Sequence, residues 1–170
     1  NGTDTRGEKV RPVWEDGTPA YTIKKFGVVN RYDLSKEFPA LTLRRTAIKS
    51  CTDELLWIWQ QKSNNIKDLH SHIWDSWANN WNVCQYAVLI HMLAQVCDME
   101  VGEFVHVIAD AHIYDRHVPM IEELISREPL PAPQFWLNPE IRDFYQFTRD
   151  DVKLIDYQTH DQIKNIPVAV

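Results

Sequence analysis

The segment Asp110-Ala-His112-Ile-Tyr114 carries polar groups at a spacing that could bind a ligand. On an extended segment, residues two apart face the same way, so Asp110, His112 and Tyr114 share one side. Three polar groups on one face, at the end of an apolar strand, suit a ligand with hydroxyl groups. From these residues alone, a histidine and a tyrosine satisfied within the core remain the alternative interpretation.

Glu54 lies in a helical pattern and is flanked by Leu55, Leu56 and Trp57. An acid among large apolar groups either lies at the solvent edge or is buried, where it can exchange protons near neutral pH. A solvated helix face is the competing interpretation.

Arg11 and Asn82 are weaker candidates when each is taken alone. Arg11 precedes Pro12 in a polar loop, and a guanidinium group matches the geometry of a phosphate, although simple exposure to solvent explains it equally well. Asn82 precedes an apolar helical stripe, which makes it a candidate N-cap. The arginines of the N-terminal third are where we expect an anionic ligand to bind.

The histidines and cysteines do not form a metal-binding pattern. The close histidine pairs, His70 with His72 and His112 with His117, have no cysteine or carboxylate at ligand spacing, so we predict no metal site. The cysteines form no CxxC pair, and each lies on an apolar helical face. They are predicted to be buried, reduced thiols, and they are Cys51, Cys84 and Cys97.

Composition excludes several classes of protein. A length of 170 residues fits one domain, and the net charge of −6 argues against general affinity for nucleic acid or an anionic membrane. No apolar run is long enough to span a bilayer, and the start of the sequence has no signal-peptide core, so we expect a cytoplasmic protein. The absence of an initiating Met leads us to expect a trimmed chain.

The elements that would position these residues are of both kinds. Helical spacing predicts helices over residues 47–62 and 118–126, and a third that follows Asn82. Alternating or continuous apolar runs predict strands over residues 21–29, 135–137 and 152–157, and a buried strand over 104–109. We therefore expect an α+β fold in which a mixed β-sheet packs against long helices.

Several of these motifs together resemble the thymidylate synthase family. The resemblance rests on Asp53-Glu54-Leu-Leu-Trp57, Ile73-Trp-Asp-Ser-Trp77, Trp81-Asn82-Val-Cys-Gln-Tyr86, Asp110-Ala-His112-Ile-Tyr114 and the terminal Pro167-Val-Ala-Val170. It implies the thymidylate synthase-like fold, a homodimer with shared active sites, and a methyltransferase. The implied reaction is the reductive methylation of dUMP to dTMP, with 5,10-methylenetetrahydrofolate as the donor of the one-carbon unit and the hydride.

The same resemblance implies a role for each candidate residue. His112 and Tyr114 would bond the 3′-hydroxyl of dUMP, and Arg11 its phosphate. Asn82 would read the uracil edge, because an amide accepts from N3–H and donates to O4 at once. Glu54 would organise waters during proton transfer. The folate would lie against four residues, which are Ile73, Trp74, Trp77 and Val170. Departures from the family pattern include Ala47, Ala109 and a longer loop after Arg11.

The junction at Asn80-Trp81 lacks the central part of the family pattern, including the catalytic Pro-Cys block and its Arg-Ser-x-Asp segment. Residues 1–170 are thus interpreted as one discontinuous domain, with an N-terminal part (1–80) and a C-terminal part (81–170). We expect the native protein to contain the central segment; an internal deletion is the second explanation. The remaining alternatives are a non-catalytic nucleotide-binding or dimerisation relative and an enzyme similar to deoxycytidylate hydroxymethylase, which carries Asp in place of Asn82.

Overall fold

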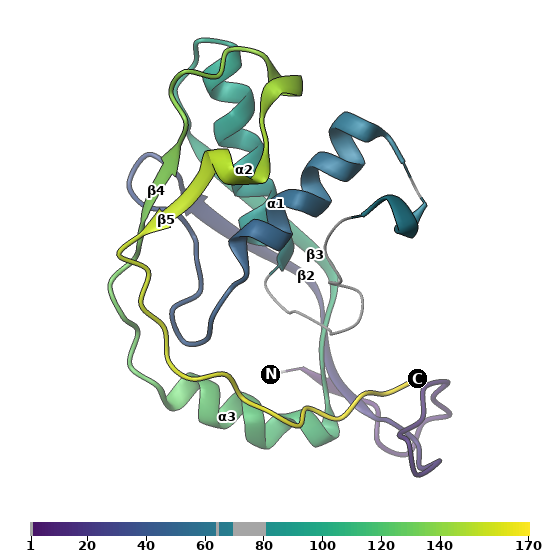
Figure 1. Cartoon of the computed structure of the whole chain (residues 1–170). Coiled ribbons are helices and arrows are strands. Elements are labelled where there is room, and N and C mark those ends of the chain that lie inside the picture. Colours follow the sequence, from purple (N-terminus) through teal and green to yellow (C-terminus); the bar gives the residue numbers. More distant parts are fainter. Residues whose placement is uncertain (1, 64, 70–80) are drawn as a thin grey trace.

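The computed structural model describes residues 2–63, 65–69 and 81–170, and it combines helices with antiparallel sheets (Figure 1). The strands are β1 (Thr3–Asp4), β2 (Thr22–Asp33), β3 (Glu103–Tyr114), β4 (Gln134–Leu137) and β5 (Val152–Ile155). The α-helices are α1 (Ile48–Leu56), α2 (Trp81–Val96) and α3 (Val118–Ser126). The predicted α+β class is confirmed.

The central sheet has the order β1-β2-β3, and its long antiparallel pair is β2 with β3. The register runs from Thr22 opposite Tyr114 to Asp33 opposite Glu103. A second, smaller sheet pairs β4 with β5 antiparallel. The strands predicted over residues 21–29, 135–137 and 152–157 are therefore present, and β2 extends four residues beyond its predicted end.

The helices follow the apolar spacing of the sequence. The helix predicted over residues 47–62 is α1 continued by a π-helical turn, Trp57–Gln61, and it ends at Lys62 in the left-handed conformation (φ 53°). The predicted helix 118–126 is α3, with a proline in its first turn, where the missing N–H costs nothing. The assignment of Asn82 as an N-cap was wrong, because α2 begins at Trp81 and Asn82 lies within its first turn.

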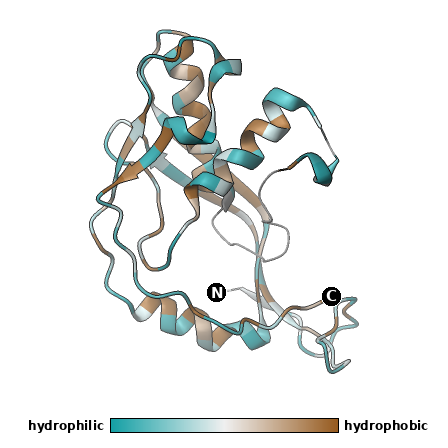
Figure 2. Cartoon of the chain, in the orientation of Figure 1, coloured by the Kyte–Doolittle hydropathy of each residue, from teal (hydrophilic) through white to brown (hydrophobic). Residues whose placement is uncertain are grey.

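The core lies where α1, α2 and the β4–β5 sheet meet. Its fully buried side chains include Leu55, Val88, Met92, Phe147 and Val152. Figure 2 shows apolar colour along much of α2, whereas α3 alternates between apolar and polar bands. Burying each large aliphatic or aromatic side chain stabilises the fold by about 2 kcal/mol, so this cluster fixes α2 against α1.

Two expectations about burial were wrong. The strand predicted as buried belongs to β3, and on one face of that strand Val105 and Val107 are 43% and 63% exposed. One face of the sheet packs on the core through Tyr32 and Phe104, while nothing in the described residues covers the other. Cys97 is exposed because it lies in the turn that follows α2.

Candidate active site

The end of β3 brings together the polar groups predicted to share one side. The rings of His112 and Tyr114 are 5.4 Å apart in a T-shaped contact, and His112 Nδ1 lies 3.2 Å from the carbonyl oxygen and 3.7 Å from Oδ2 of Asp110. The predicted geometry is confirmed. His112 is exposed and Tyr114 is half-buried, so both can be reached by a ligand.

Tyr114 also belongs to an aromatic cluster that links β3 to the N-terminal loop. Its ring makes edge contacts with Trp14 and His117, each at 5.7 Å, and Trp14 is 2% exposed. The indole Nε1 of Trp14 donates to Asp115 Oδ1 at 3.1 Å. Trp14 is thus held from two sides by the residues that follow β3, and it anchors the loop that begins at Arg11.

The N-terminal loop folds into a small hairpin, residues 12–20, in which Val13 pairs with Pro19. The amide of Gly17 donates to Trp14 O at 2.8 Å, and a positive φ of 78° at Gly17 suits this turn to glycine. Arg11 immediately precedes this hairpin and is exposed. The loop therefore presents Arg11 to solvent on a backbone that is fixed behind it.

The chain end lies beside the same hairpin, as the lower right of Figure 1 shows. The amide of Val13 donates to Val170 O at 2.7 Å, and the amide of Val170 donates to Val13 O at 2.9 Å. His117 Nε2 lies 2.8 Å from Pro167 O. The predicted phosphate loop, the end of β3 and the predicted folate-side terminus therefore meet around Tyr114 and His117.

Glu54 lies on α1, and it is 6% exposed. The solvated-face interpretation is therefore wrong. Gln85 on α2 donates from Nε2 to Glu54 Oε2 at 2.9 Å, and Gln85 itself is 4% exposed. Asn82 is exposed one helical turn earlier on α2 and, among the described residues, it makes no hydrogen bond or ring contact with His112 or Tyr114. Ile73, Trp74 and Trp77 lie outside the described residues.

The cysteines do not form a nucleophilic centre. Burial raises the pKa of the Cys51 thiol far above its usual value, and burial raises that of Cys84 to about 11. Cys84 Sγ also lies 3.5 Å from Pro39 O. Since a thiolate is the reactive form, neither buried cysteine is poised for attack. Exposed Cys97 lies beyond the far end of α2.

Sequence reasoning missed Gln85 and His117. Gln85 is a polar residue inside an apolar helical stripe, which was a usable sign of a buried partner. His117 was considered only as a metal ligand, whereas it contacts Tyr114, Trp14 and the chain end. Within the described residues, no group of three or more His, Cys, Asp or Glu side chains could hold a metal ion. In the same residues, no helix is long and apolar enough to cross a membrane.

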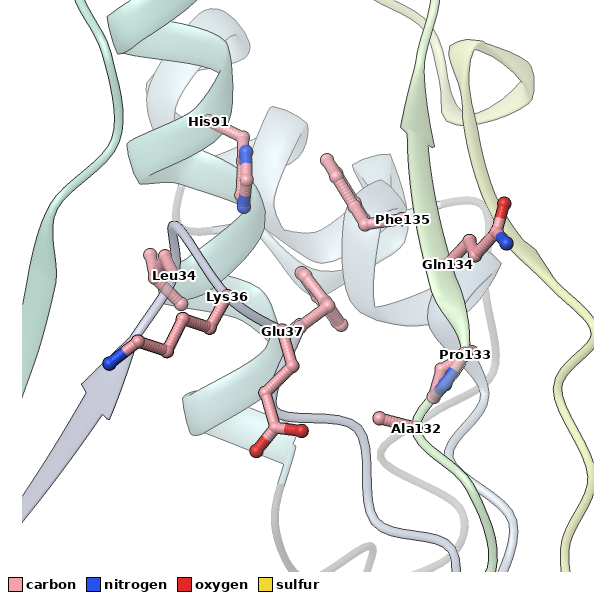
Figure 3. A pocket seen from close by; sticks show the side chains of 9 residues that line it. Leu34, Lys36, Glu37, His91, Ala132, Pro133, Gln134 and Phe135 are labelled. Carbon is pink, nitrogen blue, oxygen red and sulfur yellow. The ribbon is translucent and has the colours of Figure 1, made fainter.

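A separate pocket of about 380 Å³ contains none of the predicted site residues. His91 and Phe135 both line it (Figure 3), and their rings are in contact with centroids 4.4 Å apart. Phe38 stacks on Phe135 with centroids 4.5 Å apart. Burial lowers the pKa of His91 to about 4, so this ring is neutral at physiological pH. Lys36 and Glu37 complete part of the lining.

The fold and the matches to known proteins define a methyltransferase of nucleotide biosynthesis. The sequence profile of the thymidylate synthase family matches residues 4–81 and 78–170, so the chain belongs to the thymidylate synthase family. Thymidylate synthase 1 of Bacillus subtilis (strain 168) is 30% identical over 96% of this chain and 92% of that protein. The enzyme of Bacillus phage phi3T matches with the same identity and coverage.

A solved structure gives the same result. Thermostable thymidylate synthase A from Bacillus subtilis superposes with a TM-score of 0.91 at 30% identity, covering 100% of this chain and 94% of that one. The alignment with the B. subtilis relative spans 257 positions, more than the 170 residues of this chain, so the relative has residues opposite a gap. The two profile matches meet at residues 78–81, beside the junction that the motifs indicate.

Proposed function

We propose that the protein catalyses the conversion of dUMP to dTMP, with 5,10-methylenetetrahydrofolate as the donor of both the one-carbon unit and the hydride. The observation that supports this most directly is the arrangement around Tyr114. Its ring contacts His112 on β3 and Trp14 in the hairpin after Arg11, and the chain end pairs with the same hairpin. Family membership supports the reaction, and this arrangement supports the proposed positions of the nucleotide and its cofactor.

In this proposal the nucleotide is held at both ends. The exposed guanidinium of Arg11 binds the phosphate, and His112 with Tyr114 bonds the 3′-hydroxyl of the deoxyribose. Asn82 reads the uracil edge through its amide, which can accept and donate together. Glu54 is the buried acid that organises waters near the base during proton transfer.

The proposal assigns a separate set of residues to the binding of the folate. Ile73, Trp74 and Trp77 would contact the pterin, because aromatic faces stack on flat rings. The carboxylate of Val170 would close the site over the cofactor. The pairing of Val170 with Val13 supports this, because it holds the chain end beside the phosphate loop.

The nucleophile is assigned to a segment outside these 170 residues. The reaction needs a cysteine thiolate that attacks C6 of the pyrimidine. Cys51 and Cys84 are buried with raised pKa values, and Cys97 lies past the far end of α2. The active protein in this proposal therefore carries a central segment between the two matched ranges, and residues 1–170 form one domain together with it.

The proposed assembly is a cytoplasmic homodimer. The uncovered face of the β2–β3 sheet carries Val29, Val105 and Val107, and an ion pair joins Arg31 to Glu103 at its edge. An apolar sheet face of this kind suits burial against a second copy of the same face. Sedimentation at rising protein concentration tests this, and a monomer at every concentration contradicts it.

The deciding experiment starts with the intact mass of the protein purified from its native source. A mass several kilodaltons above the 20.0 kDa of this chain supports the central segment. That protein should release tritium from 5-tritiated dUMP when folate is supplied, and it should form a covalent adduct with 5-fluoro-dUMP and the cofactor. Binding of dUMP without either result would instead identify a non-catalytic nucleotide-binding relative.

A further inference from the structure

A buried contact between Gln85 and Glu54 joins α2 to α1. Gln85 Nε2 lies 2.9 Å from Glu54 Oε2 and 3.3 Å from the carbonyl oxygen of Cys51. Both side chains are nearly sealed from solvent, with Gln85 4% and Glu54 6% exposed. A hydrogen bond to a carboxylate in such a setting is stronger than one between neutral groups.

The orientation of the Gln85 amide is fixed by chemistry. Its two neighbours, a carboxylate oxygen and a backbone carbonyl, accept hydrogen bonds. If the amide were flipped, its oxygen would face two acceptors, which is repulsive. The amide nitrogen must therefore face both of them, and it donates one hydrogen to each.

On α2, Gln85 lies close to Asn82, the residue proposed to recognise the base. Gln85 is three residues after Asn82, so the two side chains leave neighbouring positions on the helix surface. Asn82 is exposed, whereas Gln85 turns inward to Glu54. One turn of α2 therefore carries both Asn82, which is proposed to recognise the uracil edge, and Gln85, which donates a hydrogen bond to Glu54.

We propose that Gln85 is a positioning residue for the reaction, which holds the Glu54 side chain in one rotamer. This inference rests on the proposed function of the site. Without this donor, the Glu54 side chain loses a hydrogen bond that fixes its direction, and other rotamers become accessible. Gln85 acts through Glu54 and contacts neither the nucleotide nor the folate.

The kinetic test compares Gln85→Met in the full protein with a matched control on the same helix. Met keeps the length of the side chain and removes the donor. Gln95 is the control, because its Nε2 likewise donates to two acceptors, Asn138 O at 2.9 Å and Ile141 O at 2.8 Å. Gln95→Met loses the same number of hydrogen bonds without touching Glu54.

We expect Gln85→Met to lower kcat about tenfold, with KM for dUMP changed less than about twofold. Gln95→Met should leave both kcat and KM for dUMP unchanged. Equal effects of both variants would make the role of Gln85 merely structural and overturn the proposal.

A second readout does not depend on turnover. Crystal structures of the unaltered protein and of Gln85→Met report the rotamer of Glu54 directly. Glu54 should have a single rotamer in the unaltered protein and a changed or mixed one in Gln85→Met. One unchanged rotamer in Gln85→Met overturns the proposal even in an active enzyme. Failure of the unaltered protein to make dTMP counts against the proposed function alone, and the comparison of the two crystal structures then decides the role of Gln85.

Discussion

Arg116 Nη2 donates to Asp16 Oδ2 at 2.7 Å and joins the turn after β3 to the N-terminal hairpin. The same nitrogen donates to Thr18 Oγ1 at 2.8 Å, and the guanidinium lies over the Trp14 ring at 5.0 Å. Hydrogen bonds from Thr18 and Arg116 hold the pKa of Asp16 well below its usual range. The hairpin that presents Arg11 and receives the chain end is thus fastened to the strand that carries His112.

Removing the Arg116 side chain should loosen the N-terminal hairpin while the rest of the fold stays intact. In Arg116→Ala we expect faster hydrogen exchange at the amides of Val13 and Val170, because their mutual hydrogen bonds join the hairpin to the chain end. The thermal midpoint should barely move, since ion pairs exposed to solvent add little to stability. Exchange measured by NMR or mass spectrometry checks this. Arg31→Ala, which breaks an exposed pair with Glu103, should leave both amides unchanged.

The thiols should differ sharply in reactivity. Cys51 and Cys84 are 0% exposed and have raised pKa values, whereas Cys97 is exposed. At pH 8 a disulfide reagent should therefore modify one thiol of this chain rapidly, and the other two only after denaturation. Peptide mapping separates these thiols from any cysteine of the central segment, and Cys97→Ser should remove the fast modification at that position. Rapid modification of Cys51 or Cys84 in the folded protein would contradict their burial.

His91 should make the fold sensitive to mild acid. Burial lowers its pKa to about 4 in the folded chain from an ordinary value of 6.5, so below pH 6.5 the unfolded chain binds a proton that the folded chain does not. Stability therefore falls as pH drops from 6.5 towards 4. Between pH 7 and pH 5 the loss from this residue amounts to about 2 kcal/mol.

His91→Phe tests this, because it keeps a ring in contact with Phe38 and Phe135 and removes the titrating group. Urea unfolding at pH 7 and pH 5 gives the free energy of unfolding of each protein. The unaltered chain should lose about 2 kcal/mol more than the variant over this interval. Equal losses in the two proteins would show that His91 is not the group responsible.

Most helices and strands could be predicted, because each follows from the spacing of apolar residues within its own segment. The helix over 118–126 follows from apolar spacing and a following proline cluster, and the structure gives the same bounds. Burial of β3 could not be predicted from its own residues. Val105 and Val107 are as apolar as core residues, and they are exposed because none of the residues that the structure describes covers their face of the sheet.

The candidate site likewise combines one feature that a local pattern predicts with others that no local pattern predicts. The shared side of Asp110, His112 and Tyr114 follows from the two-residue period of a strand. The aromatic cluster of Trp14, Tyr114 and His117 needs contacts across about 100 positions of the sequence, as in the hydrogen bond from Trp14 to Asp115 (|i−j|=101). No local pattern contains such a contact. The roles assigned to Arg11, Glu54, Asn82 and Val170 stay predictions.

Asn82→Asp should change which pyrimidine the full protein prefers. A carboxylate can only accept hydrogen bonds, so it suits the amino group of cytosine and repels the O4 of uracil. We expect the ratio of kcat/KM for dUMP to that for dCMP to fall at least about a hundredfold, because a base edge left unpaired is rejected strongly. Steady-state rates with each nucleotide measure this ratio. Asn165→Asp is the control, since it makes the same chemical change at an exposed, left-handed position (φ 57°) that aspartate tolerates. An unchanged ratio in Asn82→Asp would remove Asn82 from the recognition of the base and leave only His112, Tyr114 and Arg11 to hold the nucleotide.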